Sequence, residues 1–204
     1  MGELMTVSAP VNLPVGPLGR HGTGWWGAVT LIVSEAALFV YLLFSYFYTA
    51  ATAHAGWLLE PAPSLKRALP NTLLLLASSV AVWIGERGIL RRKRSQALLS
   101  FALALILGAI FVYVQWLEWQ TRSYGVGTSS YASLYYLTTG MHIAHVLVGL
   151  IVLAAIFLWT ALGYFGPQRY IAVSAAALYW HFVNVVSVLV FAAFYLTPYL
   201  GFGR

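Results

Sequence analysis

The fold of this chain is decided by one uninterrupted apolar stretch, residues 134–162, which reads LYYLTTGMHIAHVLVGLIVLAAIFLWTAL. A helix needs about 20 apolar residues to cross roughly 30 Å of hydrocarbon, so this stretch is long enough to span a membrane and to tilt within it. It carries His142 and His145 at a depth where an ionisable side chain needs a partner, a protein-facing position or a function. The stretch therefore predicts a membrane-spanning helix that meets other helices.

Four further stretches have the same character, and together they predict a bundle of five transmembrane helices. The expected spans are residues 25–50, 71–88, 97–119, 134–162 and 171–196. Of all residues 61% are hydrophobic and 8% are charged, whereas soluble proteins have about 25% charged residues. Alternating strands of about ten residues, which indicate an outer-membrane barrel, do not occur in the sequence. The expected class is an all-α, polytopic integral membrane protein.

The sequence predicts a single membrane domain, residues 25–204, with no second domain. Residues 1–24 are rich in Pro and Gly and have no apolar core, so we expect a cytoplasmic segment there and not a cleavable signal peptide. Residues 52–69 contain two prolines and are followed by Pro70, which predicts an external loop. The chain has no cysteine, which excludes disulfides, thiolate metal sites and cysteine nucleophiles.

The distribution of Lys and Arg predicts the orientation in the membrane. With five spans, the N-terminus, the second loop and the fourth loop share one side, which carries seven cationic residues against four on the other side. By the positive-inside rule the N-terminus is then cytoplasmic and the C-terminus lies outside. The run Arg91–Arg94 dominates this count. It could instead be a nucleic-acid or lipid-binding patch, but its place in a short loop favours a topology anchor, so no nucleic-acid partner is expected.

Glu35 is an acidic residue inside the first predicted span. It lies about ten residues from the start of that span, which corresponds to a depth of roughly 15 Å at 1.5 Å per residue. The residues three and four positions away on either side are all apolar. Two interpretations stay open: Glu35 relays protons or contacts lipid, or it is a neutral acid that hydrogen-bonds a neighbouring helix and helps assembly.

The fourth span places polar and small residues on one helix face. Thr138, His142, His145 and Gly149 follow each other at steps of four, three and four residues. Small residues let helices approach closely, and intramembrane polar groups usually pair with other helices. A metal site needs a third ligand, which this helix lacks, although His181 could in principle supply it. Two histidines on one face do not bracket a haem iron, so a packed, hydrogen-bonded histidine stripe is expected.

Two more spans carry stripes that indicate helix packing. In the fifth span His181 and Asn184 share a face, and the Asn184 amide could donate and accept hydrogen bonds across a helix interface. In the second span Asn71 and Ser78 lie seven residues apart, which is again one face. The sequence has no Gly-rich phosphate loop, Ser–His–acid set or carboxylate pair. It is therefore expected to hold no catalytic residue, cofactor site or metal site of its own.

The order of these motifs resembles subunit III of the haem-copper respiratory oxidases, which include cytochrome c and quinol oxidases. The similar segments are, in chain order, Ser34-Glu35, Leu69-Pro70-Asn71-Thr72, Leu76-Ala77-Ser78-Ser79, Gln115-Trp116-Leu117-Glu118-Trp119, Thr139-Gly140-Met141-His142-Ile143-Ala144-His145-Val146 with Gly149, and Ala175-Ala176-Ala177-Leu178-Tyr179-Trp180-His181-Phe182-Val183-Asn184-Val185-Val186. Each motif is weak alone, but their recurrence in order through all five spans is specific. Five helices are similar to the shorter, bacterial form of this subunit.

This resemblance implies a non-catalytic subunit of a proton-pumping, cytochrome c oxidase-type complex in a bacterial plasma membrane. Haem and copper are then expected in partner subunits, with subunit I as the principal partner and subunit II as another. The resemblance also implies bound phospholipid between the helices and support for proton uptake during dioxygen reduction. Glu35 matches the family's intramembrane glutamate, and the family's recurring polar positions are matched by Glu118, His142, His145 and His181. At Asn184 the family commonly has Asp, so a role that needs ionisation is not expected there.

Other functions are compatible with the same residues. One is a subunit-III-like accessory protein of a nitric oxide reductase. Another is a small haem- or quinone-binding membrane protein that uses His142, His145 and His181. Bis-histidine haem sites usually pair residues across helices, and the sequence has no duplicated histidines on facing spans. A transporter is less favoured, because neither broken helices nor inverted repeats are visible.

Overall fold

The structure, a computed structural model, describes residues 23–52, 57–58 and 65–200, which form five long helices. These are α1 (Thr23–Thr52), α2 (Leu65–Leu90), α3 (Arg94–Gln120), α4 (Ser130–Ala161) and α5 (Ile171–Phe191), and α5 continues into the π-helical segment η1 (Ala192–Leu196) and the 3₁₀ turn η2 (Thr197–Leu200). All five helices are long and apolar enough to cross a membrane. No strand forms within the described ranges, so the all-α, polytopic class is confirmed.

The second helix begins earlier than the sequence predicts. α2 starts at Leu65, so residues 65–69, which were expected in the external loop, are helical and Pro70 lies inside the helix. The carbonyl that Pro70 leaves without its usual donor belongs to Lys66, the second residue of α2. Only one hydrogen bond at the helix start is therefore lost. Residues 1–22, the two prolines of the loop and Arg204 lie outside the described residues.

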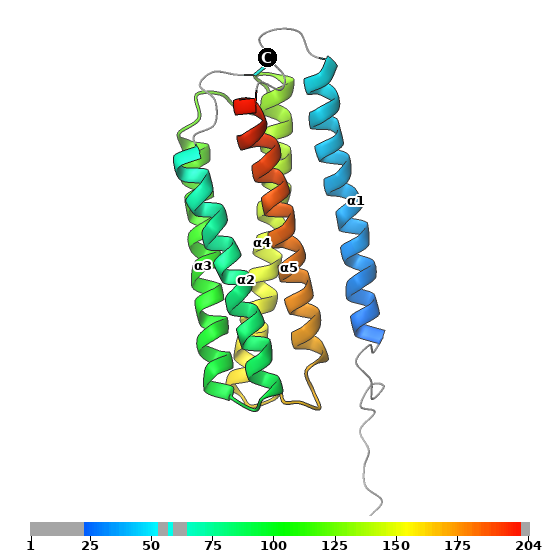
Figure 1. The fold of residues 1–204 in the computed structure, drawn as a ribbon, viewed down its shortest axis with the longest axis vertical. Helices are drawn as coiled ribbons and strands as arrows, with labels where there is room; N and C mark the ends of the chain where they lie inside the picture. The colour runs from blue at the N-terminus through cyan, green and yellow to red at the C-terminus, as the bar shows by residue number, and fades with distance from the viewer. Residues whose placement is uncertain (1–22, 53–56, 59–64, 201–204) are drawn as a thin grey trace, which may run out of the picture.

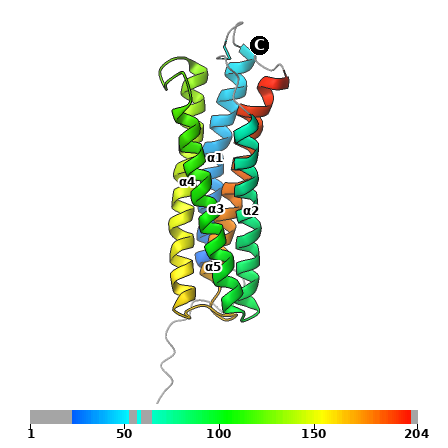
Figure 2. The same ribbon diagram turned by 90° about the vertical axis from the view of Figure 1, so that its left-hand side faces the viewer.

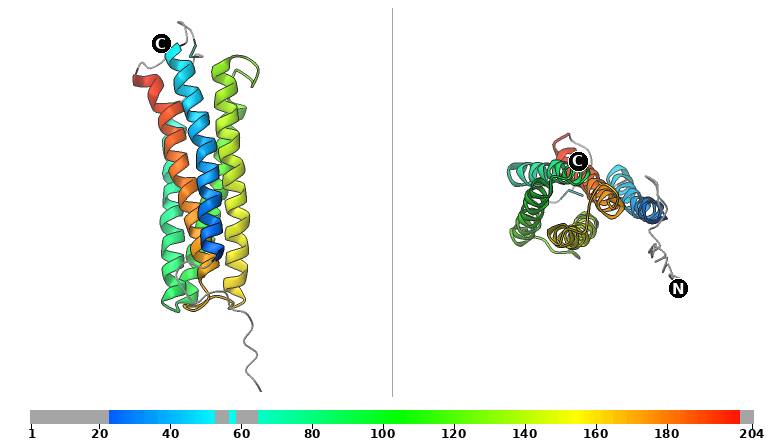
Figure 3. Two further views of the ribbon diagram at one scale, coloured as in Figure 1. Left: turned by 90° about the vertical axis from the view of Figure 1, so that its right-hand side faces the viewer. Right: turned by 90° about the horizontal axis from the view of Figure 1, so that it is seen from below.

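Four of the helices form a bundle, and α1 lies against its outside (Figure 1). Seen from one end, α2, α3, α4 and α5 follow one another around a ring, while α1 stands next to α5 (Figure 3). A view from the side shows that all five helices run along the long axis of the molecule (Figure 2). α1 packs on α5 and α4. Much of its surface is consequently open to the surroundings.

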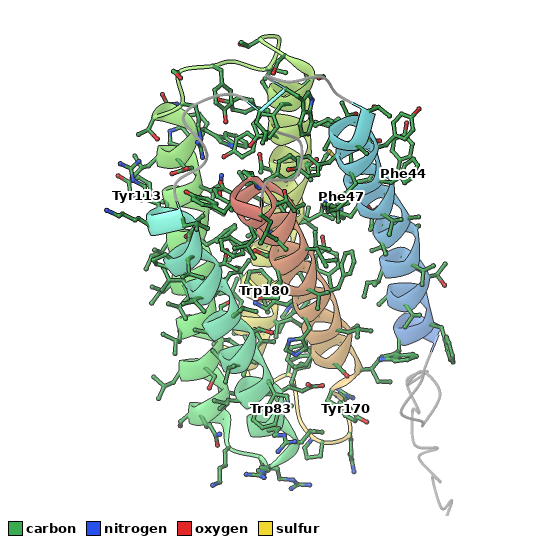
Figure 4. The ribbon with its side chains drawn as sticks, turned by 45° about the horizontal axis from the view of Figure 1, so that its top comes forward. Phe44, Phe47, Trp83, Tyr113, Tyr170 and Trp180 are labelled. Atoms are coloured by element: carbon green, nitrogen blue, oxygen red, sulfur yellow. The ribbon has the colours of Figure 1, made fainter. Side chains whose placement is uncertain are left out.

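Trp180 lies in the middle of the four-helix bundle (Figure 4). Its side chain is fully buried, and its indole N–H donates to Ser78 Oγ of α2 at 3.0 Å. Gly149 of α4 and Gly108 of α3 leave room for the ring. A Cβ atom on Gly149 would lie 2.7 Å from Trp180 Cε3, and one on Gly108 would lie 3.0 Å from Cη2. Three helices therefore meet α5 around one indole.

Two helices end at the same side of the bundle in the same type of turn. After α4, Gly163 has a φ of 80°, and after α2, Arg92 has a φ of 57°. In both turns the next backbone N–H donates to the carbonyl five residues before it, which is the Schellman arrangement. Glycine fits this left-handed position without strain, whereas a residue with a Cβ atom costs roughly 1 kcal/mol more there.

Candidate functional site

Glu35 of α1 and His145 of α4 are in direct contact. Glu35 Oε2 lies 2.9 Å from His145 Nε2, and His145 Nδ1 lies 2.7 Å from the Met141 carbonyl oxygen. Because that carbonyl can only accept, Nδ1 carries a proton and donates it. Nε2 then either accepts from a neutral glutamic acid or, in an imidazolium, donates to a carboxylate. In both cases one proton is shared between Glu35 and His145.

This pair lies beside a cavity of about 200 Å³ between α1, α4 and α5. The other lining residues are mainly apolar, namely Leu31, Ala144, Val148 and Tyr179. The Tyr179 hydroxyl donates to the His145 carbonyl oxygen at 3.2 Å. The Glu35 side chain is 32% exposed and that of His145 is 11% exposed. The carboxyl is therefore the more accessible partner, and the imidazole lies behind it.

His142 lies one turn before His145 but faces a different environment. It is buried, and the rings of Phe39 and Phe111 meet it edge-on at centroid distances of 6.4 and 5.7 Å. Neither ring nitrogen has a hydrogen-bonding partner among the described residues. The hydrogen-bonded histidine stripe expected from the sequence does not extend to His142. Three residues correspond to about 60° of rotation around a helix, which turns His142 away from Glu35 and toward Phe111 of α3, while Phe39 of α1 contacts both imidazole rings.

A smaller cavity of about 20 Å³ lies beside His142, among α2, α3, α4 and α5. Asn71 and Gln115 are among its lining residues. Asn71 Nδ2 donates to the Phe111 carbonyl oxygen of α3 at 3.3 Å, so Asn71 links two helices. Asn71 Oδ1 and Gln115 Nε2 have no partner in the described part of the chain. Unpartnered polar atoms around a cavity of this size are the usual setting of a buried water molecule.

His181 and Asn184, which share a face in the sequence, make contacts with different helices. His181 Nδ1 lies 2.5 Å from Ser79 Oγ of α2. Asn184 is buried, and its Nδ2 donates to the Trp180 carbonyl oxygen of its own helix at 2.8 Å. The hydrogen bond that was expected across a helix interface is therefore made within α5. A short amide side chain reaches the carbonyl one turn earlier, and this competes with an interhelical partner.

The three histidines of α4 and α5 consequently have separate neighbours. His145 contacts α1, His142 contacts aromatic rings, and His181 contacts α2. His181 does not join the other two. Among the described residues, no group of three His, Cys, Asp or Glu side chains is placed to hold a metal ion.

A buried ion pair lies at the end of α3. Glu118 pairs with Arg122, and its second carboxylate oxygen lies 3.9 Å from Arg67 Nη1 of α2. The Arg122 side chain is 8% exposed and lies 5.3 Å from the centre of the Tyr135 ring. Burial raises the pKa of the nearby Tyr124 phenol to about 12, so this group stays neutral near pH 7. In the sequence, Arg122 served only as one of the loop cations that predict the orientation. Its spacing of four residues from Glu118 nevertheless indicates an ion pair between the two side chains.

These features define a polytopic helical membrane protein in which ionisable side chains make contacts between helices. A model of the family described as cytochrome c oxidase subunit III matches residues 20–199. The chain is 34% identical over 174 residues to cytochrome c oxidase subunit 3 of Artemia franciscana, and this alignment covers 83% of the chain and 67% of that protein. Cytochrome c oxidase subunit 3 of Synechocystis sp. is 32% identical over 185 residues, with 87% and 78% covered. The protein of Gallus gallus is 31% identical over 177 residues, with 83% and 68% covered.

The chain belongs to the cytochrome c oxidase subunit III family. It is thus a membrane subunit of a terminal oxidase and works together with other oxidase subunits. The resemblance drawn from the motifs is confirmed. All three relatives carry an oxidase name, which favours an oxidase over a nitric oxide reductase as the host complex.

Proposed function

We propose that this chain is a non-catalytic, supporting subunit of a bacterial plasma-membrane oxidase. In this proposal subunit I is the principal partner, subunit II is a second one, and haem, copper and the dioxygen chemistry belong to those partners. The supporting role is to hold phospholipid and to help proton uptake by subunit I. The observation that carries it is the Glu35–His145 pair beside an apolar cavity between three helices.

A phospholipid suits this cavity by its chemistry. The apolar walls suit acyl chains, and the free oxygen of the Glu35 carboxyl can accept a hydrogen bond from a headgroup ammonium or hydroxyl group. Ionisable groups inside a membrane are costly, so a carboxyl that is one-third exposed at such a cavity indicates a function beyond packing.

The same pair suits proton transfer because it shares one exchangeable proton. The Met141 carbonyl holds the proton on Nδ1, which leaves Nε2 and the Glu35 carboxyl to exchange the other. A proton can therefore move between these two groups without a change in the backbone. Imidazole and carboxyl groups are the side chains most often used for such transfer.

Glu35→Gln tests this proposal in the purified oxidase complex. The amide can still donate to His145 Nε2 but cannot give up a proton, so we expect normal assembly and a near-normal initial rate of oxygen reduction. Activity should then decline severalfold sooner during sustained turnover, with less phospholipid bound per complex by mass spectrometry. Glu86→Gln, an acid on α2 that does not line the cavity, is the matched control. Unchanged turnover, stability and bound lipid in Glu35→Gln would remove the proposed role.

The non-catalytic part of the proposal has its own test. The chain purified alone should show no Soret absorption. A stoichiometric haem spectrum would favour the haem-binding alternative that uses His142, His145 and His181.

A further inference from the structure

An arginine-lined cavity lies at the end of the bundle where α2 connects to α3 and α4 connects to α5. It has a volume of about 390 Å³. Trp83 of α2 and Tyr170 lie toward this end of the bundle (Figure 4). Three cationic residues line it, Arg92, Arg94 and Arg169, together with Tyr164 and Phe165. No acidic residue is found in this lining. We call this site the arginine cavity.

We propose that the arginine cavity binds the phosphate of an anionic phospholipid headgroup. A guanidinium group is planar and binds phosphate oxygens in a bidentate manner, and the volume is in the range of small-ligand sites. The site shares no lining residue with the cavity at Glu35. The inference therefore stands independently of the proposed function.

Arg94 is already engaged by the protein. Its Nε donates to the Thr160 carbonyl oxygen at 3.0 Å, and its Nη2 donates to the Ala161 carbonyl oxygen. These carbonyls end α4 and carry the negative end of its dipole. Arg94 compensates that negative end, which leaves Arg92 and Arg169 as the charges available to a ligand.

Arg92 occupies a backbone position that glycine fits better. Its φ of 57° matches the turn after α4, where the equivalent residue is Gly163. An arginine in this strained position points to a use for its side chain. That side chain lines the arginine cavity.

An apolar surface continues from the cavity along α4, which favours a lipid over a free phosphate. Trp159 contacts Phe165 of the cavity wall at a ring-centroid distance of 6.4 Å. In the last turn of α4 Leu158 is 59% exposed, and Leu162, the residue after the helix, is 76% exposed. Aromatic residues are typical of the membrane–water interface, the depth of a headgroup. An anionic head with acyl chains fits both surfaces, whereas free phosphate would use only the arginines.

The test uses the oxidase complex that contains this chain, with dioleoyl phosphatidylglycerol as the probe. Native mass spectrometry should show that it is retained in preference to phosphatidylcholine with the same chains. Arg92→Gln combined with Arg169→Gln should weaken retention roughly fivefold per arginine. The matched control, Arg91→Gln with Lys93→Gln, removes the same charge from the neighbouring loop outside the cavity lining and should behave as the unchanged complex.

A second variant separates ligand binding from folding. Arg92→Gly removes the charge but relieves the positive φ. It should have a thermal stability equal to or above that of the unchanged complex and still lose phosphatidylglycerol.

Several results would overturn the proposal. These are normal retention in the Arg92→Gln, Arg169→Gln complex, an equal loss in the control, or displacement of the lipid by millimolar inorganic phosphate, which would indicate a free-phosphate site. Dissociation of this subunit from the variant complex, with lipid retention unchanged, would indicate instead that an acidic segment of a partner subunit occupies the cavity.

Discussion

Trp180 sets how closely the bundle helices approach one another. The indole bonds Ser78 of α2, while Gly108 of α3 and Gly149 of α4 face its ring. Lipid tails are as apolar as the side chains, so helix association in a membrane depends on van der Waals packing and interhelical hydrogen bonds. A larger residue beside this ring forces a helix outward and removes both kinds of contact.

We therefore expect Gly149→Ala to destabilise the subunit by about 2 kcal/mol, because its Cβ atom would overlap the Trp180 ring. The measurement is the thermal transition of the purified complex and the fraction of complexes that keep this subunit. Gly140→Ala on the same helix is the control, since its Cβ atom would meet only Trp119 Cη2 at 3.8 Å. Equal thermal transition temperatures for Gly149→Ala and Gly140→Ala would show that packing against Trp180 does not determine the stability of the subunit.

At the scale of residues, the sequence indicates which polar groups lie in the membrane but not where each one points. His142 and His145 differ by about 60° around the helix, and this small angle separates an unpartnered imidazole from one that shares a proton with Glu35. The outcome depends on how α4 is rotated against α1, which a single helix pattern does not specify. The Glu118–Arg122 pair, by contrast, was predictable from spacing alone.

At the scale of elements, α1 is held to the bundle by one side. Phe39, Leu42 and Tyr46 are its buried aromatic and aliphatic contacts, while neighbouring residues such as Val40 are open.

All five spans could be predicted because each is long and apolar. The start of α2 could not be predicted in this way. Pro70 is the sixth residue of the helix, and a proline normally indicates that a helix begins at or after it.

Phe39 is one of the buried residues through which α1 packs on the bundle. Its ring is 2% exposed and lies 5.0 Å from the His145 ring and 6.5 Å from Phe182, between centroids. Phe39→Ala should cost roughly 3 kcal/mol through the cavity it leaves, and it should loosen the Glu35–His145 contact. A lower thermal transition together with faster proteolysis near α1 would show this. Val40→Ala, at a position 66% exposed, should change neither quantity, and a comparable effect there would contradict the assignment.

At the scale of the whole molecule, cationic residues concentrate at one end of the bundle. The α2–α3 and α4–α5 connections both lie there, and together they form the arginine cavity. The other end holds the buried Glu118–Arg122 pair, in which the cation is largely neutralised by its partner. A positive charge that is already paired within the protein should contribute less to orientation than the open run Arg91–Arg94.

This asymmetry predicts that the arginine cavity faces the cytoplasm and that the C-terminus lies outside. Because one span, α5, lies between the two positions, a reporter fused after Arg204 and one inserted after Gly166 should report opposite sides. We expect alkaline phosphatase to be active in the first fusion and inactive in the second. Replacing Arg91, Arg92, Lys93 and Arg94 by Gln should yield a mixed population, since the remaining loop cations then differ little between the two sides. If the reporter after Arg204 in the unchanged chain proved to be cytoplasmic, the orientation would be opposite to the predicted one. The arginine cavity would then lie on the outer side of the membrane.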